Sequence, residues 1–231
     1  LNMAVRNAND AISLVQTADG AVVEIESMLQ RMRELAVQAA SGTYSSTDRT
    51  ALDVEFEALK AGIEDIADDT QWNGTNLLNG ASAFAFQVGA NASQTISVTI
   101  NDFETAPGGS TSVFDNLDAA AFGADGTNDL DALDVDTAAN ATTAITHIDN
   151  AFTKLNSVRA TLGSTINRLE YAADNLANVA QNTSASRSQI LDADYASETT
   201  ELAKTQIIQQ AATAMLSQAN QYSQSVLSLL K

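Results

Sequence analysis

Apolar residues recur at steps of three and four along the first forty residues of the chain. These steps average close to the 3.5-residue repeat of a coiled coil, so we predict one long helix from about Asn2 to Ala40. Ser41-Gly42 is its predicted end, because a glycine often follows the last turn of a helix. The predicted buried seam consists of Val5, Ala8, Ile12, Val15, Ala18, Val22, Ile25, Leu29, Met32, Ala36 and Ala39.

A second helix is predicted from Ser46-Thr47, a pair that offers an N-cap, to about Asp69. The short connection makes it an antiparallel neighbour of the first helix. Its predicted inward residues are Ala51, Leu52, Phe56, Leu59, Ile63 and Ile66. A turn-rich stretch with two Asn-Gly pairs follows over 71–80. The period then changes from 3.6 to 2, which predicts strands at 84–88 and 95–100 and a β-hairpin that packs on the helices.

Between residues 104 and 136 the periodicity is lost among Pro107, glycines, serines and seven aspartates. We predict an exposed, irregular acidic tip there, with one short helix around 112–121. A return helix is predicted from about Thr137, and another from Thr183-Ser184 to the C-terminus. The return seam is Ala141, Ile145, Ile148, Phe152, Leu155, Val158, Leu162, Ile166, Leu169, Ala173, Leu176 and Val179.

These elements predict a mainly α chain: an elongated, antiparallel, coiled-coil-like helical bundle with one β-hairpin and a small irregular tip. We divide it into residues 1–103 (first arm), 104–136 (tip), 137–182 (return helix) and 183–231 (C-terminal helical segment). Leu1 already lies within the helical pattern, so we expect the natural N-terminal segment to be missing.

The last helix is unusual because no charged residue occurs from Thr205 to Leu230, although glutamine, serine and asparagine are frequent. A solvated helix normally carries charge, and a membrane helix would not carry so many amides. Its apolar face is too wide for a monomer to cover, which indicates self-association. The predicted self-assembly residues are Ile207, Ala211, Met215, Leu216, Ala219, Tyr222, Val226, Leu227 and Leu230, with Ala214 on the same face.

Composition narrows the remaining possibilities. Eleven basic residues against 29 acidic ones give a net charge of -18, which disfavours nucleic acid as a partner. There is no cysteine, one histidine and no run of 18 apolar residues, so we expect no disulfide, no zinc site and no membrane span. No catalytic or nucleotide-binding motif is present, and we predict no enzyme, cofactor or metal. The aspartates at 125–136 do not fit an EF-hand, because Leu130 takes the place of the turn glycine.

Several segments of the chain resemble bacterial flagellin, and they occur in the order of that family. The matching segments are 7–10 (NAND), 28–38 (MLQRMRELAVQ), 71–74 (QWNG), 86–91 (FQVGAN), 157–163 (SVRATLG), 167–170 (NRLE), 186–188 (SRS), 192–195 (DADY) and 226–230 (VLSLL). The resemblance implies a structural filament subunit for motility, extracellular after export through the flagellar secretion channel. It also implies a short type without large outer domains. The C-terminal run resembles the inner-tube helix of the family.

The resemblance implies partners as well: other flagellin subunits, an export chaperone on the C-terminal segment, the filament cap and the hook-junction proteins. The innate immune receptor for flagellin is a further partner, and its contacts in the family fall on Arg31, Leu35 and Glu55. Arg31 and Leu35 lie one turn apart, so we expect them to share an outward face. The alternative is a cell-surface flagellin homologue that binds polysaccharide or a divalent cation. A polysaccharide site normally shows exposed aromatic residues, yet the tip offers only Phe103, Phe114 and Phe122.

Overall fold

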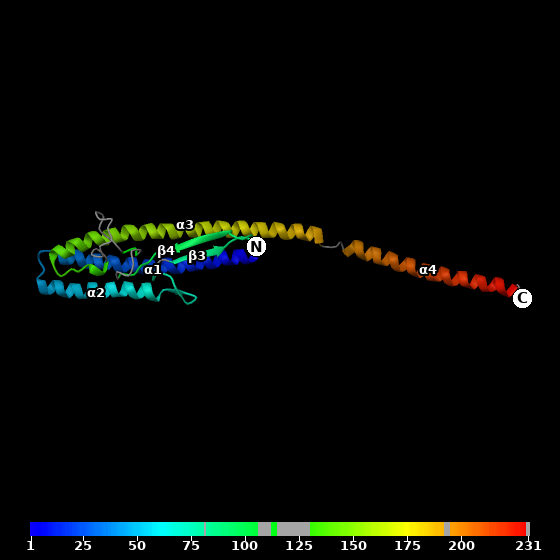
Figure 1. Cartoon of the computed structure of the whole chain (residues 1–231), viewed down its shortest axis with the longest axis horizontal. Coiled ribbons are helices and arrows are strands. Elements are labelled where there is room, and N and C mark those ends of the chain that lie inside the picture. Colours follow the sequence, from blue (N-terminus) through cyan, green and yellow to red (C-terminus); the bar gives the residue numbers. More distant parts are fainter. Residues whose placement is uncertain (81, 106–111, 115–129, 192–194, 230–231) are drawn as a thin grey trace. The chain divides into compact units, whose positions relative to one another are not determined.

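The computed structural model describes residues 1–80, 82–105, 112–114, 130–191 and 195–229, with the side chains of the last range described as far as residue 221. The chain divides into two compact units, Leu1–Ala180 and Gln181–Lys231. The first holds α1 (Asn2–Ala40), α2 (Ser46–Asp69), four short strands and most of α3 (Ala138–Leu191) (Figure 1). The second holds the end of α3 and α4 (Tyr195–Leu229). The predicted mainly α class with one longer β-hairpin is confirmed.

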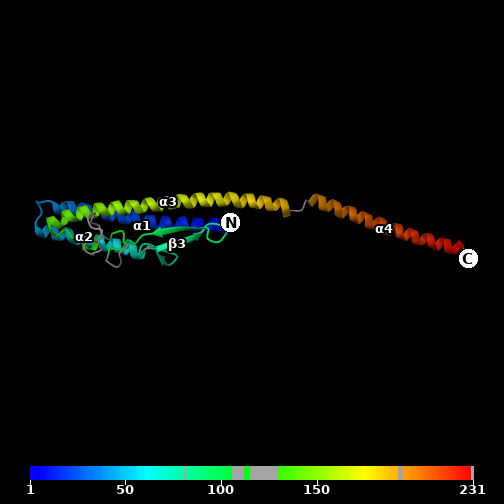
Figure 2. The same cartoon turned by 45° about the horizontal axis from the view of Figure 1, so that its top comes forward.

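Helix α1 has the predicted bounds, and all of its predicted seam is buried except Val5 and Ile12, which are half-buried. Four residues outside the seam are also buried: Ala4, Ala11, Leu14 and Leu35. The buried surface is wider than a coiled-coil seam because α2, α3 and the hairpin β3–β4 lie along α1 (Figure 2). The periodicity therefore located the helix correctly but underestimated how much of it is covered.

The end of α1 differs from the predicted glycine cap. Ser41 is extended (φ -66°, ψ 132°), and Gly42 is absent from the described residues with positive φ. The cap comes instead from Arg49 of α2, whose Nε donates to the Ala39 carbonyl at 2.7 Å and whose Nη2 donates to the Ser41 carbonyl at 3.0 Å. A cation suits these carbonyls because the C-terminal end of a helix is partly negative.

The N-cap of α2 lies one residue before the predicted pair Ser46-Thr47. Ser45 is the N-cap: its hydroxyl accepts the Asp48 N–H, and the Asp48 carboxylate accepts the Ser45 N–H at 3.0 Å. This reciprocal pair is a capping box. Phe56 and Ile63 are buried as predicted, and Leu52, Leu59 and Ile66 are half-buried against the core. The predicted inward position of Ala51 is wrong, because that residue is exposed.

The strands form two hairpins. Strands β1 (Gln71–Trp72) and β2 (Thr75–Asn76) pair around Asn73-Gly74, whose φ angles of 50° and 78° suit a tight two-residue turn. Strands β3 (Ser82–Gln87) and β4 (Thr95–Ile100) pair antiparallel, as predicted. The second hairpin packs on α1, where the Asn7 side chain donates to the Gln87 carbonyl at 3.0 Å. Val98 and Ile100 of β4 join the core.

The prediction of an exposed tip at 104–136 is wrong for much of its described part. Val113, Phe114, Leu130, Leu133 and Val135 are buried in the core of the first unit, where a 3-10 turn covers Leu130–Ala132. Residues 112–114 form a bridge and a turn; the rest of the helix predicted at 112–121 lies outside the described residues. Apolar residues spaced irregularly along a loop leave no periodic signal, so their burial was not predicted.

Helix α3 begins at Ala138, as predicted, and runs antiparallel to α1. Ion pairs show the direction: Asp149 meets Arg33, whereas Arg159, further along α3, meets Glu26 and Asp19. Most of the return seam is buried; Ile145, Phe152 and Ile166 are half-buried and Val179 is exposed. A helix start at Thr183-Ser184 is wrong, since α3 continues to Leu191. Ser and Thr cap a helix only where the backbone leaves it, and no Gly or Pro breaks α3 there.

Candidate interaction surfaces

Arg31 lies at the centre of an exposed ion-pair cluster on α1 and α2. Its guanidinium contacts Glu34 one turn later at 2.9 Å and Glu55 of α2 at 2.8 Å. All three side chains are about half exposed, with values of 49%, 60% and 46%. The hydrogen bonds that Arg31 donates to Glu55 and, to a smaller extent, to Glu34 raise the pKa of Arg31. The structure therefore brings Arg31 and Glu55 together on one accessible surface.

Leu35 does not share that surface. Its side chain is 1% exposed and belongs to the core of the first unit. The expectation of an outward Leu35 beside Arg31 is wrong. Residues four apart on a helix are neighbours on its surface, but the line between a covered and an open face can pass between them, as it does here.

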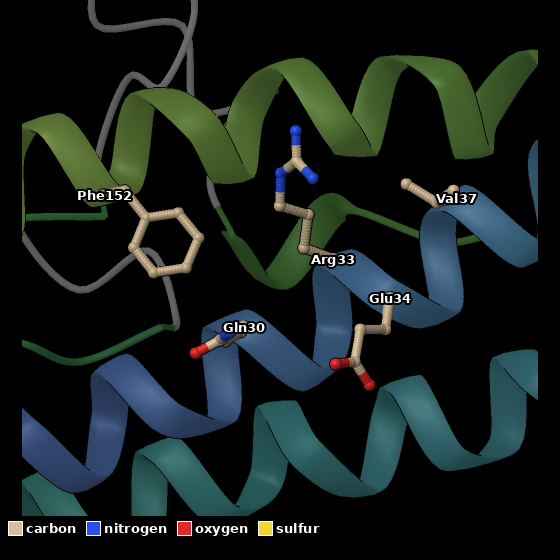
Figure 3. A pocket seen from close by; sticks show the side chains of 5 residues that line it. All are labelled: Gln30, Arg33, Glu34, Val37 and Phe152. Atoms are coloured by element: carbon tan, nitrogen blue, oxygen red, sulfur yellow. The ribbon is translucent and has the colours of Figure 1, made fainter.

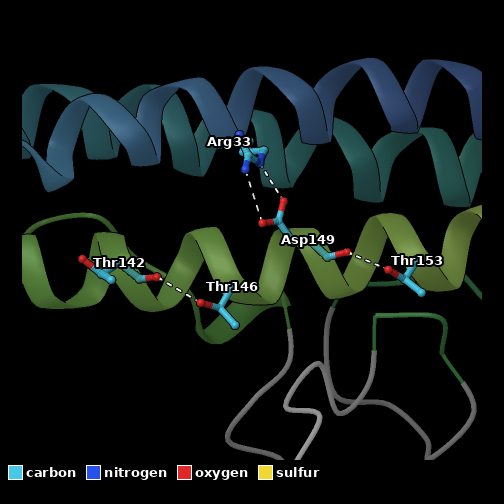
Figure 4. A network of polar contacts seen from close by, with 5 residues as sticks. All are labelled: Arg33, Thr142, Thr146, Asp149 and Thr153. Carbon is cyan, nitrogen blue, oxygen red and sulfur yellow. Dashed lines mark hydrogen bonds and ion pairs between the residues drawn. The ribbon is translucent and has the colours of Figure 1, made fainter.

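A shallow groove of about 470 Å³ lies beside this cluster, lined by Gln30, Arg33, Glu34 and Val37 of α1 and Phe152 of α3 (Figure 3). Arg33 is directed away from the nearby glutamates. Its guanidinium forms two hydrogen bonds with Asp149 of α3, at 2.7 and 3.3 Å (Figure 4). These hydrogen bonds raise the pKa of Arg33. The sequence carried no signal for this pair, because 116 residues separate its members.

From Thr205 onward, helix α4 presents a second kind of surface, apolar and uncharged. Every side chain described on it is exposed within the structure. The large apolar ones are exposed by 65% (Ile207), 58% (Ile208), 69% (Met215) and 68% (Leu216). Ala211 and Ala219 are exposed as well. At about 100° per residue, these side chains cover one side of the helix, and Gln209, Thr213 and Ser217 lie on the other.

The remaining predicted self-assembly residues cannot be placed in the same way. The side chains of Tyr222, Val226 and Leu227, and all of Leu230, lie outside the described residues. None of the described helices combines the length and apolarity that a membrane span requires.

The two aromatic residues of the predicted tip that the structure describes are not on a surface. Phe103 and Phe114 are 0% and 1% exposed and pack edge to face, with ring centroids 5.8 Å apart. Phe122 lies outside the described residues. Exposed aromatic rings are the usual platform for a sugar, and neither Phe103 nor Phe114 can supply one.

Two family models match this chain: the bacterial flagellin N-terminal helical region at residues 1–83 and the bacterial flagellin C-terminal helical region at residues 145–230. Among curated relatives, the flagellar filament 33 kDa core protein of Treponema phagedenis is 40% identical over 231 residues, covering 100% of this chain and 80% of that protein. The flagellin of Bacillus subtilis is 39% identical over 250 residues, covering 100% and 81%.

Among solved structures, the crystal structure of Bacillus cereus flagellin is similar with a TM-score of 0.58 and 32% identity, covering 79% of this chain and 94% of that one. Both helical regions, the full-length similarity and the matching fold lead to one conclusion. The chain belongs to the bacterial flagellin family, the structural proteins of the flagellar filament.

Proposed function

We propose that this chain polymerises through the apolar side of α4 defined by Ile207, Ala211, Met215, Leu216 and Ala219. The observation that carries the proposal is the uncharged part of α4 from Thr205 onward, whose large apolar side chains are 58–69% exposed. Removing such side chains from water contributes about 25 cal/mol for each Å² buried, and association is the way to bury them. The amides on the same helix satisfy their hydrogen bonds with water before assembly and with neighbours after it.

Matched charge substitutions on the two sides of α4 test this assembly surface. Met215→Glu places a carboxylate in the middle of the apolar side, where assembly would desolvate it. Ser217→Glu places the same charge on the polar side. We expect Met215→Glu to reduce filament formation by the full-length protein strongly, measured by sedimentation and electron microscopy, and Ser217→Glu to assemble like wild type. Equal assembly by both variants would contradict the proposal.

The assignments of an export route and of partner proteins rest on membership of the flagellin family. They are export through the flagellar secretion channel to the cell exterior, a chaperone on the C-terminal segment, and contacts with the filament cap and hook-junction proteins. We assign the chain no catalytic activity, because the flagellin family is a family of structural proteins. Binding of the purified chain to each partner, with and without residues 195–231, would test the chaperone assignment.

Recognition of the free monomer by the innate immune receptor is assigned to Arg31, Leu35 and Glu55. Exposure of the first and third residues supports direct contact, whereas the buried Leu35 acts by packing α1 beneath them. Arg31→Asp should lose receptor activation, and Arg6→Asp, an exposed charge reversal elsewhere on α1, should retain it. Unchanged activation by Arg31→Asp would refute the assignment.

A further inference from the structure

Three carboxylates converge where the chain leaves the hairpin after β4, and a fourth carboxylate lies two residues from one of them. We call Glu64 and Asp68 of α2, together with Asp102 and Glu104 after β4, the acidic cluster. Oxygen atoms of Glu64, Asp68 and Glu104 lie within 4.8 Å of one another. Asp102 is 5% exposed, and its Oδ1 accepts the Glu104 N–H at 2.9 Å.

The hydrogen bonds that Glu64 and Asp68 accept come from neutral donors. The backbone N–H and the hydroxyl of Thr105 donate to one Glu64 oxygen at 2.6 and 2.5 Å. The Asn79 amide donates to Asp68. Lys60, one turn before Glu64 on α2, is directed elsewhere, to the carbonyls of Asp131 and Leu133. Among the described residues, no ion pair neutralises the cluster, so its carboxylates repel one another when all are ionised.

The cluster is connected to the packing of the next described residues. The Ser112 hydroxyl donates to the Glu104 carbonyl at 2.6 Å, and the Val113 N–H donates to the Asp102 carbonyl at 2.7 Å. Phe114, which follows directly, packs against Phe103 in the core. Separation of Asp102 and Glu104 from α2 would therefore strain the contacts of residues 112–114.

We propose that the acidic cluster is a proton-responsive contact that holds residues 102–105 on α2 when Glu104 is protonated and weakens when all four carboxylates are ionised. A protonated Glu104 removes one charge from the cluster and becomes a hydrogen-bond donor to a neighbouring carboxylate. This contact lies within a single subunit, and it does not depend on the filament function.

The pKa of Glu104 is shifted in the direction that such a contact requires. Burial, and then repulsion by Asp102, Glu64 and Asp68, raises the pKa of Glu104. A carboxyl whose pKa is higher in the folded than in the unfolded chain stabilises the fold below its unfolded pKa, and this contribution is lost as the pH rises through the folded pKa. The contact between residues 102–105 and α2 is thus stronger in mild acid and weaker at neutral pH.

Hydrogen exchange measured amide by amide tests the proposal on the full chain, with a chelator present so that no divalent cation neutralises the cluster. We expect the protection factor of the Thr105 amide, which donates to Glu64, to increase as the pH is lowered from about 7 to about 5, the range just above the ordinary glutamate pKa. The Val88 amide donates to the backbone carbonyl of Gln94 at 2.9 Å in the hairpin, so it is the internal control and should keep its protection.

Two glutamine substitutions complete the test. Glu104→Gln mimics the protonated side chain, so the Thr105 amide should be highly protected at both pH values. Glu24→Gln, an exposed glutamate of α1, should retain the wild-type pH dependence. An unchanged Thr105 protection factor in wild type, or the same pH dependence in Glu104→Gln, would overturn the proposal. Circular dichroism of each variant confirms that the helices remain folded.

Discussion

Lys60 is the most deeply buried cation among the residues that the structure describes, and its substitution should destabilise the first unit. Its side chain is 4% exposed. The ammonium donates to the carbonyls of Asp131 and Leu133, each at 2.8 Å, and contacts Glu57 at 2.6 Å. It lies 5.9 Å from the centroid of the Phe56 ring. One lysine on α2 thus holds the chain that returns from the segment 104–136 to α3.

Lys60→Met keeps an unbranched apolar side chain and removes the donors. A hydrogen bond to a charged group contributes about 1.5–3 kcal/mol to the free energy of unfolding. The variant loses two such bonds, to the carbonyls of Asp131 and Leu133. The Asp131 carbonyl is only partly buried and can bind water, and the methionine recovers some apolar burial, so we expect a net loss of about 3 kcal/mol. For a unit of this size, that loss lowers Tm by roughly 6–12 °C. Replacing a buried charge can leave the stability unchanged when its partner is replaced as well. Here the two carbonyls stay in place without their donor.

Thermal unfolding followed by the fluorescence of Trp72, the only tryptophan, reports on the first unit. Lys204→Met is the matched control, since Lys204 pairs with Glu201 at 3.6 Å on exposed α4, with side chains 63% and 68% exposed. An exposed pair of this kind contributes less than about 1 kcal/mol. If the two variants lowered Tm equally, the reasoning about buried carbonyl partners would be refuted.

Two further predictions concern the backbone and the N-cap of α2. At both Gly74 and Gly20 an added Cβ meets nothing within 4 Å, so an alanine tests the backbone alone. Gly74→Ala should lower the free energy of unfolding by about 1–2 kcal/mol because φ at this position is +78°. Gly20→Ala inside α1 should raise it by about 0.5–1 kcal/mol. Urea unfolding measures both changes, and changes of the same sign would contradict this reasoning. The hydrogen bonds from Ser45 lower the pKa of Asp48, so their stabilisation is present above the unfolded pKa and lost as the pH falls through the folded one. Ser45→Ala should make melting between neutral pH and about pH 2 less acid-sensitive, and an unchanged profile would exclude this role of the cap.

Features that depend on neighbours in sequence were predictable. The bounds of α1 followed from a periodicity that any helix with one covered side must show, and the hairpin β3–β4 followed from the change of period to 2. The turn at Asn73-Gly74 followed from the tolerance of these two residues for positive φ. The uncharged side of α4 was also evident, since the absence of charge is a property of composition.

Only the tertiary structure decided which groups meet across long separations. The cap of α1 comes from Arg49, Arg33 pairs with Asp149, and the acidic cluster joins α2 to the residues after β4. Leu35 is buried because several elements surround α1, whereas the sequence pattern assumed one covered side. Periodicity records which side of a helix is apolar, but long-range pairing depends on how the helices and loops pack. The sequence by itself therefore determined α1, α2, the start of α3, the hairpin and the family, and packing determined the polar contacts that hold them together.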